Sequence, residues 1–108
     1  MKAILIDSKN RTVSQIEVSN AYPDINKAIG VDLICVGTEL PGATLYVDDE
    51  GLLKSENTVF EFQGAHQPFA GNGVILGFDP NEEEENKDCP YTVEQIRAKV
   101  KWTNKYVI

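Results

Sequence analysis

The residues best suited to binding chemistry gather in one stretch, residues 63–73. This stretch holds the single histidine of the chain, three carboxamides, one phenylalanine and three of the eight glycines. Amides and an imidazole can hydrogen-bond the edges of a planar base, an aromatic ring can stack on it, and glycines allow close approach of backbone N–H groups. The pattern predicts a ligand-binding loop formed by Gln63, His66, Gln67, Phe69, Asn72 and Gly73. The alternative is a turn-rich connector with Phe69 in the core.

Neither cysteine has the setting of a catalytic or metal-binding thiol. Cys35 lies in an apolar run, where burial raises a thiol pKa, and Cys89 follows glutamates that disfavour a thiolate. Together with His66 the cysteines lack paired ligand spacing, so we expect two free thiols and no metal site. No P-loop or dinucleotide motif is present, because Gly71-Asn72-Gly73 precedes a strand rather than a helix. We therefore expect no enzyme, no catalytic residue and no cofactor.

Charge is concentrated in one acidic segment. The formal net charge is −7, and residues 79–88 hold six of the seventeen acidic residues and one lysine. An acidic chain lacks the cationic face that nucleic-acid binding requires, so we expect no direct nucleic-acid binding. A run of like charges is typically a solvated loop, and we expect an exposed acidic loop at residues 79–89. The alternatives are a contact for a basic partner or an adventitious cation site; a calcium loop is disfavoured because its ligand spacing is missing.

Length and hydropathy favour one domain spanning residues 1–108. A chain of 108 residues with 42% hydrophobic residues is large enough to bury a core without disulfides. The longest apolar stretch, Ala3 to Ile6, is too short to span a bilayer, and the first residues do not resemble a signal peptide. We expect a protein of the bacterial cytoplasm that does not contact a membrane.

Alternating apolar residues predict strands in the first half of the chain. Ala3–Asp7 and Thr12–Val18 predict a hairpin, and Asp32–Val36 and Thr44–Val47 predict a second one with its turn at Pro41-Gly42. Between the hairpins, Tyr22-Pro23-Asp24 and the apolar residues after it predict a short helix that ends at Gly30.

The second half predicts fewer elements. Val59–Phe62 fits a strand or a short helix, and Val74–Leu76 fits a buried strand. The last element begins at Thr92, which has capping-box spacing to Gln95, and Val93, Ile96 and Val100 share one helical face. The fold class predicted is α+β, a mostly antiparallel sheet of about five strands with a short helix and a C-terminal helix on one face.

Four blocks in this order resemble a known family. The blocks are Met1–Asp7, Ile29–Leu33, Leu45–Leu52 and Gln67–Gly77. The chain resembles a family of short uncharacterised proteins, a domain of unknown function common in phages and mobile elements of Gram-positive bacteria. The resemblance implies a phage or mobile-element accessory protein, and it supplies no catalytic residues.

The sequence leaves two candidate functions for this protein. The first is a non-enzymatic protein that counters a host defence by sequestering a small nucleotide-like signal, with positive charge lent by Lys2, Arg11, Lys27, Lys54 or Arg97. The second is an acidic protein-directed inhibitor that occupies a basic nucleic-acid-binding surface of a host enzyme. We also expect a homo-oligomer, because Trp102, Tyr106, Val107 and Ile108 suit a dimer contact, although they suit packing on their own sheet equally well.

Overall fold

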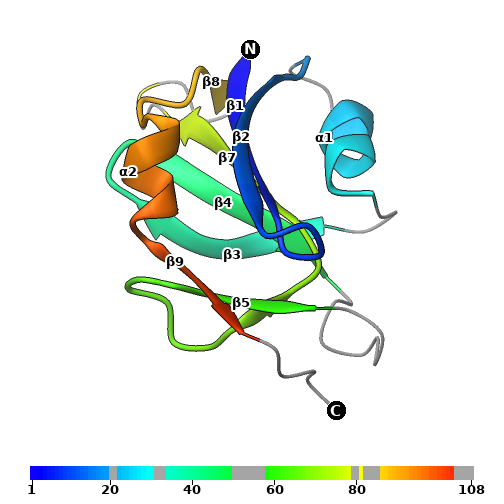
Figure 1. The fold of residues 1–108 in the computed structure, drawn as a ribbon. Coiled ribbons are helices and arrows are strands. Elements are labelled where there is room, and N and C mark those ends of the chain that lie inside the picture. Colours follow the sequence, from blue (N-terminus) through cyan, green and yellow to red (C-terminus); the bar gives the residue numbers. More distant parts are fainter. Residues whose placement is uncertain (20–21, 31–33, 50–57, 79–80, 82–85, 104–108) are drawn as a thin grey trace.

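The computed structural model describes residues 1–19, 22–30, 34–49, 58–78, 81 and 86–103, which form two sheets and two short helices (Figure 1). In chain order the elements are β1 (Lys2–Asp7), β2 (Thr12–Glu17), α1 (Tyr22–Ile29), β3 (Ile34–Leu40), β4 (Ala43–Asp48), β5 (Val59–Phe62), β6 (Phe69–Ala70), β7 (Gly73–Phe78), β8 (Asn86–Lys87), α2 (Val93–Arg97) and β9 (Val100–Thr103). The predicted α+β class is confirmed, and the strands divide into a larger and a smaller sheet.

All strand pairs are antiparallel. The larger sheet has the order β2-β1-β7-β4-β3, with β8 paired to the end of β7, and the smaller sheet has the order β6-β5-β9. The chain passes from the smaller to the larger sheet at Gly71 and Asn72, between β6 and β7. Gly71 has a φ of 83°, and its N–H donates to the carbonyl of Thr58 at 2.9 Å. This bond extends the β5–β6 pairing to the point at which the chain enters the larger sheet.

Strand β7, at the centre of the larger sheet, is buried on both faces, and its successive side chains point to opposite sides of the sheet. In β7, Ile75 packs in a cluster between the two sheets, whereas Val74 and Leu76 pack in a second cluster under α1. Helix α1 contributes Ile25 and Ile29 to that second cluster. Burial on both faces explains why β7 is an unbroken apolar run rather than an alternating one.

Three aromatic residues of the smaller sheet, Phe60, Phe69 and Trp102, have neighbouring rings in the cluster between the sheets. Phe60 is fully buried, and its ring centroid lies 5.7 Å from that of Phe69 and 6.5 Å from that of Trp102. We call these three residues the aromatic cluster. Ile96 of α2 packs in the same core, so α1 and α2 lie against opposite faces of the larger sheet (Figure 1).

Both predicted hairpins and the short helix are confirmed. Asp7 closes the β1–β2 turn by accepting bonds from the backbone and side chain of Asn10, at 3.1 and 2.8 Å. Gly42 takes a φ of 74° in the β3–β4 turn. Helix α1 ends before Gly30, whose φ is 88° and whose N–H donates to Asn26 at 2.8 Å. The structure also decides the open case at Val59–Phe62, which is a strand.

The C-terminal helix is shorter than predicted. It begins as expected, with the capping box between Thr92 and Gln95, but it ends at Arg97. Val100, assigned to the helical face from its spacing, lies in β9 and packs against the core between the sheets. Pairing with β5 supplies the backbone hydrogen bonds of β9 and places Trp102 in the aromatic cluster. Tertiary packing therefore outweighs the helical spacing.

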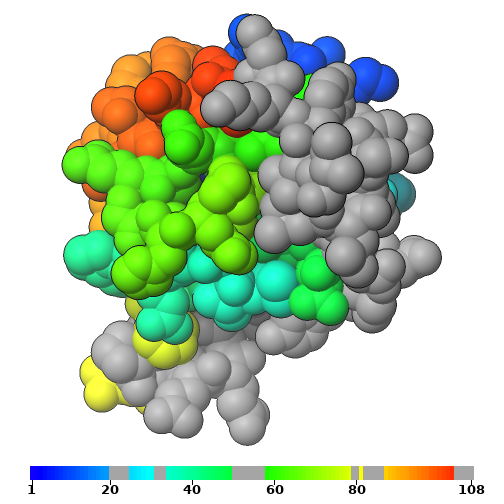
Figure 2. Space-filling view, turned by 90° about the horizontal axis from the view of Figure 1, so that it is seen from below, coloured from blue at the N-terminus to red at the C-terminus, as the bar shows by residue number. Residues whose placement is uncertain are grey.

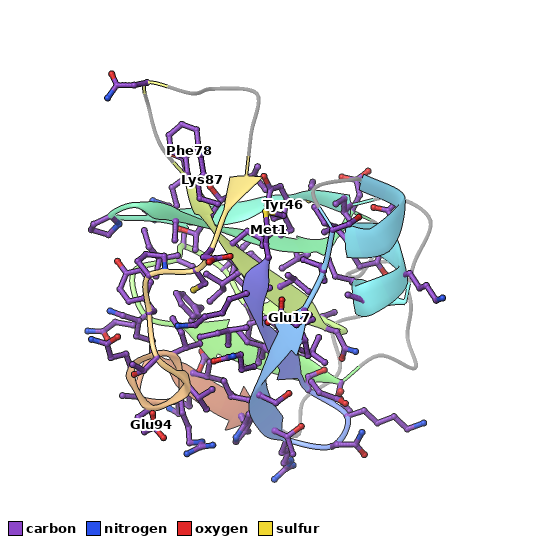
Figure 3. All side chains as sticks on the ribbon, turned by 90° about the horizontal axis from the view of Figure 1, so that it is seen from above. Met1, Glu17, Tyr46, Phe78, Lys87 and Glu94 are labelled. Atoms are coloured by element: carbon purple, nitrogen blue, oxygen red, sulfur yellow. The ribbon has the colours of Figure 1, made fainter. Side chains whose placement is uncertain are left out.

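Two predicted regions lie outside the described residues. They are the glutamate run at 82–85, within the acidic loop expected at 79–89, and the apolar tail at 106–108. The end of the acidic segment does form structure, since β8 pairs with β7 there, and Figure 3 shows Phe78 and Lys87 next to each other where these strands meet. Neither helix of the described chain is long and apolar enough to cross a membrane.

Candidate functional site

The outer side of the smaller sheet carries charged residues. In the β5–β9 ladder Glu61 lies opposite Lys101, and the Glu61 Oε2 and Lys101 Nζ atoms are 3.9 Å apart. The adjacent cross-strand pair, Phe62 and Val100, packs in the core on the inner side. At these two pairs, strand alternation separates apolar side chains on the inner side from charged side chains on the outer side.

A tight turn after β5 holds the next segment over the start of β9. The N–H of Gln63 donates to the carbonyl of Lys99 at 2.9 Å, which extends the β5–β9 ladder by one bond. Gly64 follows with a φ of 91°, and the N–H of Ala65 donates back to Phe62 at 3.1 Å. The backbone of this turn is thus fixed, and the side chains after it lie beside Lys99.

These elements border an open surface hollow of about 540 Å³. We call it the lysine hollow, and it is lined by Glu61, Phe62, Gln63, Ala65, His66, Gln67, Pro68, Ala98, Lys99 and Lys101. Figure 2 looks onto this face of the molecule, where the segment after β5 (green) lies between the α2–β9 segment (orange to red) and β3 (teal). The lining combines two ammonium groups, one carboxylate, two carboxamides and an imidazole with apolar side chains, a composition with one excess positive charge that suits a small anion with a planar part.

The structure brings together three of the six residues predicted to bind a ligand. Gln63, His66 and Gln67 all line the lysine hollow and are exposed. Phe69 does not line it, because its ring is buried in the aromatic cluster and only 5% exposed. A stacking role for Phe69 in this hollow is therefore not supported by the geometry.

Asn72 and Gly73 also lie apart from the lysine hollow. Asn72 is half-buried between β6 and β7, and Gly73 is a buried residue of β7. A Cβ built on Gly73 would lie 2.8 Å from the Leu45 side chain and 3.3 Å from the Phe60 ring. The glycine at this position therefore allows close packing between strands rather than close approach of a ligand.

A second hollow, of about 300 Å³, lies on the other side of Gln67. We call it the cysteine hollow, and it is lined by Cys35, Val36, Gly37, Val47, Asp48, Asp49, Gln67, Phe69 and Ala70. Burial raises the pKa of the Cys35 thiol, a hydrogen bond with Asp49 raises it further, and so do the charges of Asp49 and Asp48. The Cys35 thiol therefore stays protonated at neutral pH and is a poor nucleophile.

The thiol of Cys89 is also protonated at neutral pH, for a different reason from the one expected. Burial raises its pKa, and a backbone hydrogen bond at Tyr91 and the charge of Lys2 only partly oppose this. Both cysteines are free, as predicted. Among the described residues, no group of three or more histidine, cysteine or acidic side chains is placed to hold a metal ion.

Sequence reasoning missed the charged residues of the lysine hollow. The basic residues expected to help a ligand were Lys2, Arg11, Lys27, Lys54 and Arg97; the four described ones do not line the hollow, and Lys54 lies outside the described residues. Lys99 and Lys101 supply the positive charge instead. The signal was the alternation of Lys99, Val100, Lys101 and Trp102, which is a strand pattern.

Comparison with protein families covers the elements just described. A family model described as a domain of unknown function (DUF3846) matches residues 1–102. The chain belongs to the DUF3846 family. Both hollows lie within the matched residues, so they are features of the DUF3846 domain of this chain. No curated protein and no solved structure matches the chain.

Proposed function

We propose that this DUF3846 protein is a non-enzymatic binding protein that takes up a small nucleotide-like anion in the lysine hollow. The observation that carries the proposal is the pairing of Lys99 and Lys101 with the polar side chains of Gln63, His66 and Gln67 around one hollow. Two ammonium groups suit a phosphate, and carboxamides and an imidazole suit the polar edge of a base. A volume of about 540 Å³ lies within the range of small-molecule sites.

Binding without catalysis is supported by the chemistry of the nearby groups. Cys35 is protonated, and it lies in the cysteine hollow rather than beside His66. The described lining of the lysine hollow contains no cysteine, serine or threonine that His66 would activate as a nucleophile. Stoichiometric capture needs only a shaped site with fixed polar groups.

The biological role we propose is sequestration of a signal molecule of a host defence in the bacterial cytoplasm, by a phage or mobile-element protein that acts as a homo-oligomer. Support for this context comes from the four sequence blocks at Met1–Asp7, Ile29–Leu33, Leu45–Leu52 and Gln67–Gly77. Capture of a signal is compatible with an acidic protein only if positive charge is concentrated locally, and Lys99 and Lys101 provide such a concentration.

The test is a matched pair of charge-removing variants. K99Q/K101Q removes both ammonium groups of the lysine hollow, and K9Q/K27Q removes two exposed ammonium groups outside it. We expect wild type and K9Q/K27Q to bind AMP in an amide NMR titration, and K99Q/K101Q to bind it at least ~10-fold more weakly, as loss of two charge-assisted contacts requires. Equal affinity of the two variants for AMP would contradict the proposal.

A second measurement separates this function from the acidic-inhibitor alternative. Replacing Glu82–Glu85 with serine removes the acidic run and keeps every described residue that lines the lysine hollow. If the protein sequesters a nucleotide, this variant retains both AMP binding and protection of the infecting element. Loss of protection with AMP binding intact would favour the protein-directed inhibitor instead.

A further inference from the structure

The charges that line the lysine hollow are not all of one sign. The described lining contains two ammonium groups, Lys99 and Lys101, one carboxylate, Glu61, and the imidazole of His66. Counting the two ammonium groups against the one carboxylate, the hollow has an excess of one positive charge. A site built only to hold strongly charged phosphates has no use for a carboxylate in its wall, because that carboxylate repels each added negative charge.

The position of Glu61 is set by the fold. It lies between Phe60 and Phe62, which are both buried, so strand alternation directs its side chain to the outer side of the sheet. The register of β5 with β9 then places it opposite Lys101, with 3.9 Å between the charged atoms. Any anion that contacts Lys101 in the hollow lies close to the Glu61 carboxylate.

We propose that Glu61 makes the lysine hollow selective for a singly charged anion of the phosphodiester class over terminal phosphates and polyphosphates. This inference rests on the proposed function. A diester presents one negative charge, which matches the excess of one positive charge. A monoester or a triphosphate presents more, and Glu61 opposes each additional charge while competing for Lys101.

The expected size of the effect follows from Coulomb's law. At about 6 Å in water, one unit charge changes the affinity for another by about threefold. Removing the Glu61 charge should therefore strengthen binding of a singly charged ligand by about threefold, and that of a triphosphate by more than ~10-fold. Salt reduces both factors, so all titrations are compared at one low ionic strength.

The experiment uses two ligand series in which the negative charge of the phosphate part rises from the first member to the last: cyclic AMP, AMP and ATP, and the corresponding guanosine compounds. Each is titrated into wild type, E61Q and E39Q, with binding followed by amide NMR. Glu39 is an exposed carboxylate of β3 that does not line the hollow, so E39Q removes the same charge elsewhere. We expect wild type and E39Q to bind the cyclic nucleotide most tightly, and E61Q to lose this preference.

The outcomes separate a loss of selectivity from a loss of binding. If wild type prefers the triphosphate, or if E61Q changes all affinities by the same factor, the selectivity role of Glu61 is wrong although the binding function stands. If no nucleotide of either series shifts the amides of the hollow, the proposed function fails and this inference fails with it. Both members of the Glu61–Lys101 pair are largely exposed, at 53% and 81%, so E61Q is expected to fold.

Discussion

The two sides of the β5–β9 ladder come from alternate residues of the same strands, yet they differ in burial and in chemistry. On the inner side Phe60 is fully buried and contacts the ring of Trp102. On the outer side Glu61 and Lys101 are exposed and pair loosely. The buried rings of the inner side stabilise the fold, whereas the exposed Glu61–Lys101 pair of the outer side contributes little to stability. Residues that stabilise the fold thus alternate with residues proposed to bind the ligand. Substitutions should therefore change stability and ligand affinity separately.

The largest expected effect is on the inner side. Phe60→Ala removes a ring that packs against both Phe69 and Trp102. We expect the free energy of unfolding to fall by about 3–5 kcal/mol, as for other buried phenylalanines. Urea denaturation measures this. A loss below about 1 kcal/mol would mean that the aromatic cluster is not the centre of the core.

Gly73 and its neighbour Asn72 provide a sharper comparison. A Cβ at Gly73 would meet Leu45 at 2.8 Å, so Gly73→Ala is expected to cost about 1–3 kcal/mol of stability through overpacking. Asn72 is half-buried and does not line the lysine hollow, so Asn72→Ala should leave AMP affinity unchanged. Weaker AMP binding in a folded Asn72→Ala variant would show that Asn72 contributes to ligand binding.

The outer side should show the reverse behaviour. His66→Ala and Gln67→Ala remove exposed polar groups of the lysine hollow. Each should change thermal stability by no more than about 0.5 kcal/mol. AMP affinity should nevertheless fall by roughly 2- to 10-fold, the effect of one lost hydrogen bond. NMR titration and thermal melts of the same samples test both statements, and a stability loss without an affinity loss would make these residues structural.

The smallest effect concerns the cysteine hollow. Because Asp49 raises the pKa of Cys35, Asp49→Asn should lower that pKa and speed alkylation by iodoacetamide by a few-fold near neutral pH. Cys89 is 2% exposed, so iodoacetamide should not alkylate it in the wild type or in Asp49→Asn until the protein unfolds. The raised pKa of Cys35 also predicts stability that is present at neutral pH and is lost as the pH rises above about 9, where the unfolded thiol ionises first. Unchanged alkylation in Asp49→Asn would show that burial alone protects Cys35.

Sequence patterns identified the longer elements because their alternation is regular over several residues. Ala3–Asp7 and Thr12–Val18 correspond closely to β1 and β2, and their turn follows from polar residues. Strands β6 and β8 have two residues each, too few for any period to show. Val100 fitted both a helical and a strand period, and only its pairing with β5 decides between them.

The candidate site was predictable only where its residues are adjacent in the chain. Gln63, His66 and Gln67 stood out through composition, and they do lie together. Lys99 and Lys101 join them through the β5–β9 register, a contact between distant segments that no local pattern specifies. The sequence predicts Phe69 as a ligand contact because an aromatic ring suits stacking on a base. In the structure the ring packs against Phe60 in the core instead.

The pairing of β7 with β8 makes this domain a suitable carrier for inserted peptides. Phe78 lies opposite Asn86, and Gly77 opposite Lys87, so the two ends of the intervening segment are held together by strand pairing whatever sequence joins them. Beyond Lys87, the side chain of Asp88 accepts a bond from the N–H of Lys2 at 2.8 Å, and the N–H of Cys89 donates to the Lys2 carbonyl at 2.9 Å. Doubling a loop closed in this way costs only about 0.6 kcal/mol of closure entropy. An epitope or fluorescent reporter could therefore be displayed between Phe78 and Asn86, a segment that contains none of the described residues that line the two hollows.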